Sequence, residues 1–185
     1  MFYNAAAFNQ PLNDWGSKLG NVKTMESMFQ KATIFNQNIS QWNVFSVTNT
    51  RLMFDGASEF NQNISSWNVN NVENMEGMFA NASKFNQPLN DWGIKLESIT
   101  VIKRMFVNAI LFNQPLDTWG SKLGNVTTME TMFQTASAFN QDISQWNVSS
   151  VTDTSNMFRN TKSFNQNISS WNVNNVENMS YMFFK

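Results

Sequence analysis

The dipeptide Met-Phe recurs at a nearly fixed interval along the whole chain, and this internal period constrains the fold more than any other feature. Each unit follows the pattern M-F-x-x-[AT]-x-x-F-N-Q-x-[LI]-x-x-W and then carries apolar residues about three positions apart. All seven Trp residues occupy the same position in the unit. Seven units are thereby defined, at 1–27, 28–52, 53–77, 78–104, 105–131, 132–156 and 157–181, and residues 182–185 begin an eighth.

The units have two lengths, which differ directly after the Trp residue. Short units read W-N-V-x-x-V, whereas the first, fourth and fifth units read W-G-x-K-L-x-x-[VI] and are two residues longer. The added stretch contains Gly16, Gly93 or Gly120, and glycine is suited to a wider turn at the corner of a coil. A longer period is also present, because 105–185 repeats most residues of 1–81. A block of four units has therefore been duplicated.

A unit of this size is too small to bury its own apolar face, so neighbouring units must stack. Around residues 8–13, apolar and polar positions alternate with the period of two that is typical of a short strand. From Leu19 to Phe35 the apolar residues are three or four apart, which favours short 3₁₀ or helical turns. The sequence therefore predicts a single-domain repeat solenoid over 1–185, with one short parallel strand and a compact return segment in each unit.

Stacking of like units would place like residues in files along the solenoid. Asn9 and Gln10 head two such files, and their amides are predicted to hydrogen-bond from one coil to the next rather than to contact a ligand. The files headed by Phe2 and Phe8 are expected in the core. The file headed by Trp15 lies at a corner, and we favour a core role for it over a carbohydrate-binding stripe.

The run M-F-x-x-A-x-x-F-N-Q-x-I-S-x-W-N-V-x-x-V-x-x-M, which is almost complete from Met53 to Met75, carries a family resemblance. It resembles the 25 to 26 residue repeat of bacterial surface proteins, a mycoplasma domain of unknown function related to the BspA-like leucine-rich repeats. The resemblance covers the whole chain in seven copies. It implies a right-handed, leucine-rich-repeat-like solenoid in a secreted or surface-attached protein, and it implies no catalytic residues.

Composition argues against several classes of function. The chain has no His and no Cys, so the usual metal ligands and nucleophile–base pairs are missing, and its 13 acidic residues are scattered. We therefore expect no enzyme, no metal site and no cofactor. A net charge of −1 leaves no basic surface for nucleic acid, and no apolar run is long enough for membrane insertion, so an export signal or anchor would lie outside the given chain. The recurrent carboxylates are interpreted as a solvated face: Asp14, Glu26, Glu76, Asp91, Asp117 and Glu130.

The outward positions of the predicted strands form the candidate binding face for a protein or glycan ligand. Low charge predicts that binding there is insensitive to salt. The face comprises Pro11, Asn13, Asn38, Ser40, Asn63, Ser65, Pro88, Asn90, Pro115, Asp117, Asp142, Ser144, Asn167 and Ser169. Three of these, Asn38, Asn63 and Asn167, also lie in Asn-x-Ser sequons and are possible glycosylation sites.

Two other functions remain open at the level of sequence. The chain begins on one Met-Phe pair and stops just after another, without the polar cap that a free-standing array needs, so copies could stack end to end into a filament, sheath or capsid. Ice binding by a flat strand face is a weaker alternative, because the outward rows lack a regular Thr ladder. An extracellular or cell-surface recognition module is the leading interpretation.

Overall fold

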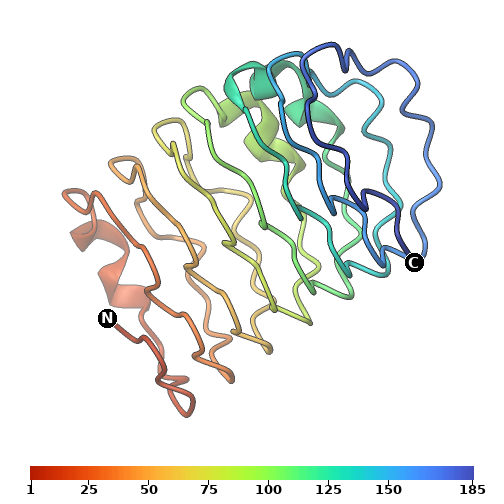
Figure 1. Cartoon of the computed structure of the whole chain (residues 1–185). Helices are drawn as coiled ribbons and strands as arrows, with labels where there is room; N and C mark the ends of the chain where they lie inside the picture. The colour runs from red at the N-terminus through yellow and green to blue at the C-terminus, as the bar shows by residue number, and fades with distance from the viewer.

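The computed structural model describes all residues, 1–185, and shows the chain as a stack of coils with the two termini at opposite ends (Figure 1). Regular secondary structure is limited to three 3₁₀ helices, η1 (Asn13–Lys18), η2 (Asn90–Lys95) and η3 (Asp117–Asn125). Each helix lies in a long unit and contains its Trp-Gly pair, so the two added residues are taken up in 3₁₀ turns. None of the helices has the length and apolar character required to cross a membrane.

The spacing of three between apolar residues arises from hydrogen-bonded turns rather than from a helix. The N–H of Val22 donates to the carbonyl of Leu19 (2.9 Å), and the N–H of Met28 donates to that of Met25 (3.1 Å). Corresponding bonds recur in later units, for example from Met132 to Met129 (3.1 Å). The short 3₁₀ or helical turns expected between residues 19 and 35 take the form of successive single turns, whereas the 3₁₀ helices are found at the corner that carries the Trp residue.

Residues in the left-handed region explain why these turns do not join into a helix. Two positions in each unit have positive φ. One is the residue directly before the Met-Phe pair, and the other lies two positions after the Phe of that pair. A left-handed residue interrupts a right-handed helix and costs roughly 1–2 kcal/mol when it is not glycine. The non-glycine residues at these positions are Asn4, Ser27, Lys31, Leu52, Asn81, Arg104, Asn108, Thr131, Thr135, Asn156, Asn160 and Tyr181.

Replacing Thr135 with asparagine is expected to raise the free energy of unfolding by about 1 kcal/mol. Thr135 is β-branched and has a φ of 60°, whereas asparagine occupies the equivalent position at Asn108 and Asn160. Asparagine tolerates this backbone conformation, and the hydrogen bond from the N–H of residue 135 to the carbonyl of Arg159 (2.8 Å) is kept. Urea unfolding measures the change, with Asn160→Thr as the reverse control. Destabilisation by Thr135→Asn would contradict the argument.

Adjacent units are joined directly through their backbones along one side of the stack. Isolated parallel bridges link Thr24 to Asn49, Asn49 to Asn74 and Asn74 to Val101, and the series resumes from Thr128 through Asp153 to Asn178. The N–H groups of Ser27 and Phe29 donate to the carbonyls of Arg51 and Met53 in the next unit (2.9 Å each). The bridged positions therefore lie just before the Met-Phe pair, and not in the 8–13 segment where the alternation predicts a strand.

In that alternating segment, side-chain amides join the coils. The N–H of Asn36 donates to Asn9 Oδ1 (3.0 Å), and Gln37 Nε2 donates to both Asn9 Oδ1 and the Asn9 carbonyl (3.1 Å each). The Asn oxygen thus takes the place of a backbone acceptor, which explains why no bridge forms here. The Asn-to-Asn bond recurs at every junction, which confirms the predicted role of this file. Its members are Asn9, Asn36, Asn61, Asn86, Asn113, Asn140 and Asn165.

The core consists of aromatic files that run the length of the stack. Phe54 stacks on Phe60 within its own unit (ring centroids 3.9 Å apart) and on Phe79 in the next unit (5.8 Å). Trp67 stacks on Trp92 (6.5 Å), and its Nε1 donates to a carbonyl of the preceding unit. All six later Trp residues make this inter-unit bond and are buried, which confirms the core assignment.

The Trp-Gly glycines have a different role from the one that the sequence suggests. Gly16, Gly93 and Gly120 are buried, and none of them has a positive φ, so a wider turn does not require them. A Cβ atom at Gly16 would lie 2.7 Å from the carbonyl oxygen of Gln41. Glycine is needed at these positions because the backbone of the next unit passes directly against the Trp corner.

Candidate functional site

The candidate binding face is open to solvent along the stack. Its first row is exposed at all seven positions: Pro11, Asn38, Asn63, Pro88, Pro115, Asp142 and Asn167. In the second row, two residues further along each unit, three side chains are exposed and four are half-buried: Asn13, Asp117 and Ser169 are exposed, and Ser40, Ser65, Asn90 and Ser144 are half-buried. The buried apolar residue between the two rows, such as Ile39 or Ile64, anchors each segment to the core. The alternation predicted from the sequence is therefore present even though no strand is formed.

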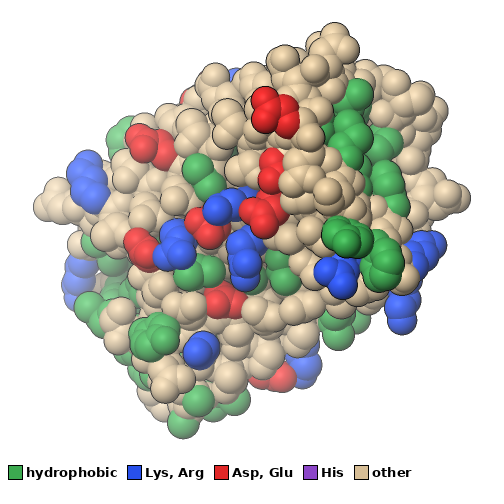
Figure 2. Space-filling model, viewed as in Figure 1, with side chains coloured by type: hydrophobic (Ala, Val, Ile, Leu, Met, Phe, Trp, Pro, Cys, Tyr) green, Lys and Arg blue, Asp and Glu red, His purple; other side chains and the backbone are tan.

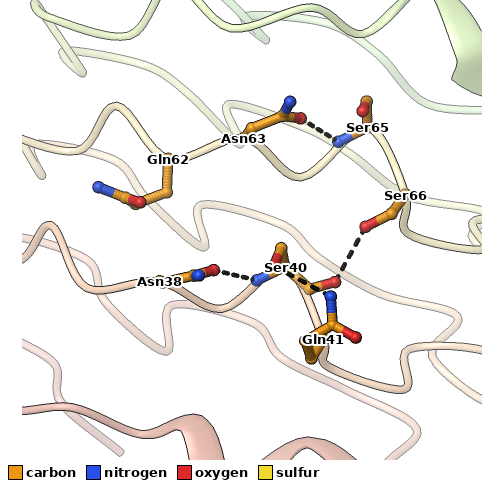
Figure 3. A pocket seen from close by; sticks show the side chains of 7 residues that line it. All are labelled: Asn38, Ser40, Gln41, Gln62, Asn63, Ser65 and Ser66. Carbon is orange, nitrogen blue, oxygen red and sulfur yellow. Dashed lines mark hydrogen bonds between the residues drawn. The ribbon is translucent and has the colours of Figure 1, made fainter.

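The structure gathers part of this face into a groove between the second and third units (Figure 3). The groove has a volume of about 340 Å³, and none of its lining residues is apolar. Within each unit an Asn side chain folds back on its own backbone: Asn38 Oδ1 accepts the N–H of Ser40, and Asn63 Oδ1 accepts that of Ser65 (2.9 Å each). The Ser66 hydroxyl donates across the junction to the Ser40 carbonyl (2.9 Å).

A second groove of the same construction lies between the sixth and seventh units. Its volume is about 380 Å³, and each lining residue stands 104 positions after its counterpart. The same bonds recur: Ser144 N–H donates to Asp142 Oδ1 (2.8 Å), and the Ser170 hydroxyl donates to the Ser144 carbonyl (2.8 Å). The only chemical difference between the two linings is Asp142 in place of Asn38. The lining residues are Asp142, Ser144, Gln145, Gln166, Asn167, Ser169 and Ser170.

The middle of the predicted face lies outside both grooves. Here Asn90 begins η2 and Asp117 begins η3, and the two helices pack against each other. Asn90 Nδ2 donates to Asp117 Oδ1 (3.0 Å), and the Thr118 hydroxyl donates to Asn90 Oδ1 (2.8 Å). The side chains that could have lined a groove bond to one another instead. Pro88 and Pro115 remain exposed beside them.

At the N-terminal end of the face, Pro11 and Asn13 line a hollow of about 320 Å³ together with Trp15. A smaller hollow of about 100 Å³ connects Asn13 to Asn38. Of the 14 predicted face residues, the structure therefore brings those of the first three units and of the last two units into hollows. The residues of the fourth and fifth units form no hollow.

The candidate glycosylation sites belong to these hollows. Asn38, Asn63 and Asn167 are exposed, and each side-chain oxygen accepts a hydrogen bond from the serine N–H of its own sequon. Asn38 and Asn63 line the first groove, and Asn167 lines the second. A sugar attached to one of them would occupy the space in which a ligand would bind.

Asp142 carries the one formal charge in either groove. The hydrogen bond from the backbone N–H of Ser144, followed by one from the Ser144 hydroxyl, lowers the pKa of Asp142 below its ordinary value. The carboxylate is therefore ionised at neutral pH, and it presents acceptor oxygens to the solvent. Asn38 offers an amide at the same place, so the first groove is neutral and the second is anionic.

Three lining residues of each groove were not part of the predicted face. Gln41, Gln62 and Ser66 line the first groove, with Gln145, Gln166 and Ser170 in the second. Gln62 belongs to the Gln file predicted to join coils, and its Nε2 does donate to Asn36 (2.9 Å) while its side chain also borders the groove. The sequence feature that could have predicted these residues is the order of long and short units, because both grooves form where two short units are adjacent.

Two of the recurrent carboxylates, Glu26 and Glu76, form ion pairs with neighbouring units. Arg51 contacts Glu26 (Nη1 to Oε1, 2.8 Å) and Glu76 (Nε to Oε2, 3.2 Å), and Lys103 approaches Glu76 (3.9 Å). The hydrogen bond to Glu26 is the largest cause that raises the pKa of Arg51. Figure 2 shows acidic and basic side chains beside one another on a face that is otherwise mostly neutral. No group of three or more acidic side chains is placed to hold a metal ion.

Comparison with known proteins identifies a family but no individual relative. A family model described as "Mycoplasma protein of unknown function, DUF285" matches residues 1–119 and 94–185, two segments that together span the chain. No curated protein and no solved structure shows significant similarity to it. The repeated units, their aromatic files and the two polar grooves are thus features of a chain that belongs to the Mycoplasma DUF285 family of unknown function.

Proposed function

We propose that this chain is a non-enzymatic, leucine-rich-repeat-like solenoid of an extracellular or cell-surface protein, which binds a ligand through its exposed row of polar residues. The observation that carries the proposal is the pair of hollowed, wholly polar grooves on one face of the stack. The coils beneath this face are fixed by the amide and Trp bonds, so the groove side chains project from a rigid support. A preordered surface loses little conformational freedom when a ligand binds.

The chemistry of the face favours a neutral, polar ligand on a protein or a glycan. Its side chains are amides, hydroxyls and prolines, with Asp117 and Asp142 as the charged exceptions. Such a face offers hydrogen-bond donors and acceptors together but little Coulomb attraction. Affinity is expected to change little between about 50 and about 500 mM salt, unlike a contact dominated by phosphate groups.

Binding to immobilised polysaccharides and extracellular glycoproteins tests this function. The test variant changes Asn38, Asn63 and Asn167 together to lysine, and the matched control changes Thr48, Thr100 and Thr127, which lie outside the candidate face, to lysine. We expect the first variant to lose binding of every ligand that the unmodified chain binds, and the control to keep it. Full binding by the first variant, with an unchanged unfolding transition, would contradict a role for this face.

End-to-end assembly is the second candidate, and it is favoured by apolar side chains exposed at both ends of the stack. In the first unit Met1 is 84% exposed, and Tyr3 is 56% exposed. In the last part of the chain Tyr181, Phe183 and Phe184 are each more than half exposed. A second copy stacked on either end would bury these groups in a heterologous contact that can propagate.

Sedimentation velocity over a range of concentrations distinguishes this candidate from the first. Assembly through the ends predicts a rising sedimentation coefficient that Tyr181→Lys together with Phe183→Lys abolishes. A concentration-independent monomer would exclude it.

A further inference from the structure

The two grooves are copies of one another in both composition and internal bonding. In each, a Gln side chain donates to the Ser hydroxyl beside it, as Gln41 does to Ser40 (3.4 Å) and Gln145 to Ser144 (3.3 Å). In each, the Gln residue of the following unit is tied back to the Asn file. The duplicated block has therefore reproduced a complete groove and not only the residues around it.

Unit length explains why there are two grooves and why they are separate. A groove forms only where two short units meet, which occurs between the second and third units and between the sixth and seventh. The intervening long units place η2 and η3 at the same edge of the stack. The chain thus presents two grooves of like construction with η2 and η3 between them.

Several polar atoms in the grooves are free to bind a ligand. The Nδ2 groups of Asn38 and Asn63 and the hydroxyl of Ser65 make no hydrogen bond within the chain, although their neighbours do. The first groove has no charge to recognise an ionic ligand, and neither groove has an apolar side chain to receive a hydrophobic one. Sugar hydroxyls both donate and accept, so they match a lining of amides and hydroxyls.

We propose that the two grooves are corresponding subsites for a neutral, hydroxyl-rich polysaccharide, and that the chain binds such a polymer bivalently. This inference rests on the proposed function of the same face and specifies its ligand and valency. The grooves are four units apart, which is roughly 20 Å at the spacing of paired strands. A polymer longer than this can contact both grooves, and the second contact is then intramolecular and strengthens the first.

Asp142 makes the two subsites unequal in strength. A carboxylate accepts hydrogen bonds from hydroxyl groups more strongly than an amide oxygen does. The second groove therefore binds a neutral sugar more tightly than the first, and it repels acidic polysaccharides. The residue that differs between the grooves thus provides an internal test of the ligand's chemistry.

The experiment uses the full chain with dextran, mannan, laminarin and galactan as neutral probes and hyaluronan as the acidic comparison. Calorimetry with a short oligosaccharide of whichever neutral polymer binds counts the sites, and surface-based binding of the polymer measures avidity. Ser65→Trp fills the first groove and Ser169→Trp fills the second. Ser163→Trp, an exposed position in the seventh unit outside both grooves, is the matched control.

We expect two oligosaccharide sites in the unmodified chain, one in each single variant and none in the double variant. Each single variant should weaken polymer binding by about 10- to 100-fold, because it removes the bivalent contact. Three results would overturn the proposal: one oligosaccharide site in the unmodified chain, single variants that bind the polymer as strongly as the unmodified chain does, or no binding by any neutral probe. A different result would separate the two proposals. If no neutral probe binds, but a glycoprotein binds the unmodified chain and not the variant with lysine at residues 38, 63 and 167, then the inference fails and the proposed function stands.

A second pair of variants avoids any question of misfolding. Asn38→Asp gives the first groove the side chain that the second already carries, and Asp142→Asn does the reverse. Asn38 and Asp142 each accept the N–H of the serine two residues further along, so the backbone is kept. Asn38→Asp should tighten oligosaccharide binding at the first groove about three- to tenfold, and Asp142→Asn should weaken the second by a similar factor. No change in either variant would exclude these grooves as the binding sites.

Discussion

Replacing Trp92 with alanine is expected to lower the free energy of unfolding by about 4 kcal/mol, the middle of the range for large aromatic residues in a core. Trp92 is fully buried, and it stacks between Trp67 (6.5 Å) and Trp119 (6.4 Å). Its Nε1 also donates to the carbonyl of Ile64 (3.1 Å), which would be left without this partner. For a chain of this size the loss corresponds to a fall in Tm on the order of 10 °C.

Two comparisons separate the contributions to this effect. Trp92→Phe keeps an aromatic ring but removes the donor, so it should cost roughly half as much. Trp171→Ala removes the same hydrogen bond, to Ile143, in the last complete unit. Because Trp171 is 7% exposed and lies near one end, its replacement should also cost less than that of Trp92. Equal losses at the two positions, measured by urea unfolding, would show that stacking from both sides contributes little.

Replacing Gly120 with alanine is expected to lower the free energy of unfolding by about 3 kcal/mol, the upper part of the range for overpacking. The new Cβ would overlap the carbonyl oxygen of Gln145 and lie 3.0 Å from its carbonyl carbon. These are backbone atoms, and they cannot rotate away. The nearby N–H of Asn147 donates to the Gly120 carbonyl (3.0 Å), so relief of the overlap would also strain this inter-unit bond.

Gly124 provides the matched control, because it lies in the same helix, η3. A Cβ at Gly124 would lie 3.2 Å from Asn147 Nδ2, which is the end of a side chain that can move. Gly124→Ala should therefore remain within about 1 kcal/mol of the unmodified chain. Thermal unfolding of the two variants measures the difference. Similar stability for both would mean that the Trp corner is less tightly packed than the distances indicate.

The files of like residues could be predicted from the sequence because each file arises from one fixed position of the repeat. Trp92 and Phe79 recur at fixed positions, and a stack of units must bury both. The inter-unit bonding of Asn61 likewise follows from placing one amide over another. These parts of the structure depend only on register, which the Met-Phe period defines.

Features that depend on atomic detail between units were not predictable in the same way. The alternation around residues 8–13 correctly separates inward from outward side chains, but it does not reveal that Asn oxygens replace the backbone acceptors there. The parallel bridges at Thr24 and Asn49 lie in a segment whose apolar spacing resembles that of a helix. The role of Gly120 requires knowledge of where the next unit's backbone passes. Positive φ at a β-branched residue such as Thr135 leaves no sequence signal at all.

The candidate site was predictable as a face but not as two grooves. The alternation of apolar and polar residues predicts only that Asn63 and Pro88 both point outward. The structure distinguishes them, because the long units form η2 and η3 beside Pro88 and Pro115 while the short units leave space beside Asn63. The order of long and short units, together with the outward positions of the alternating segment, contains the information that locates both grooves.

The Asn bond that repeats at each junction has a consequence for how such a chain can vary in length. Excision of residues 28–131 would place the sixth unit on the first, and Asn140 would then meet Asn9 in the register in which it now meets Asn113. Recombination between the near-identical blocks could therefore shorten or lengthen the protein without creating a new packing surface. Each gain or loss would add or remove one groove, while the fold of every remaining coil stays the same.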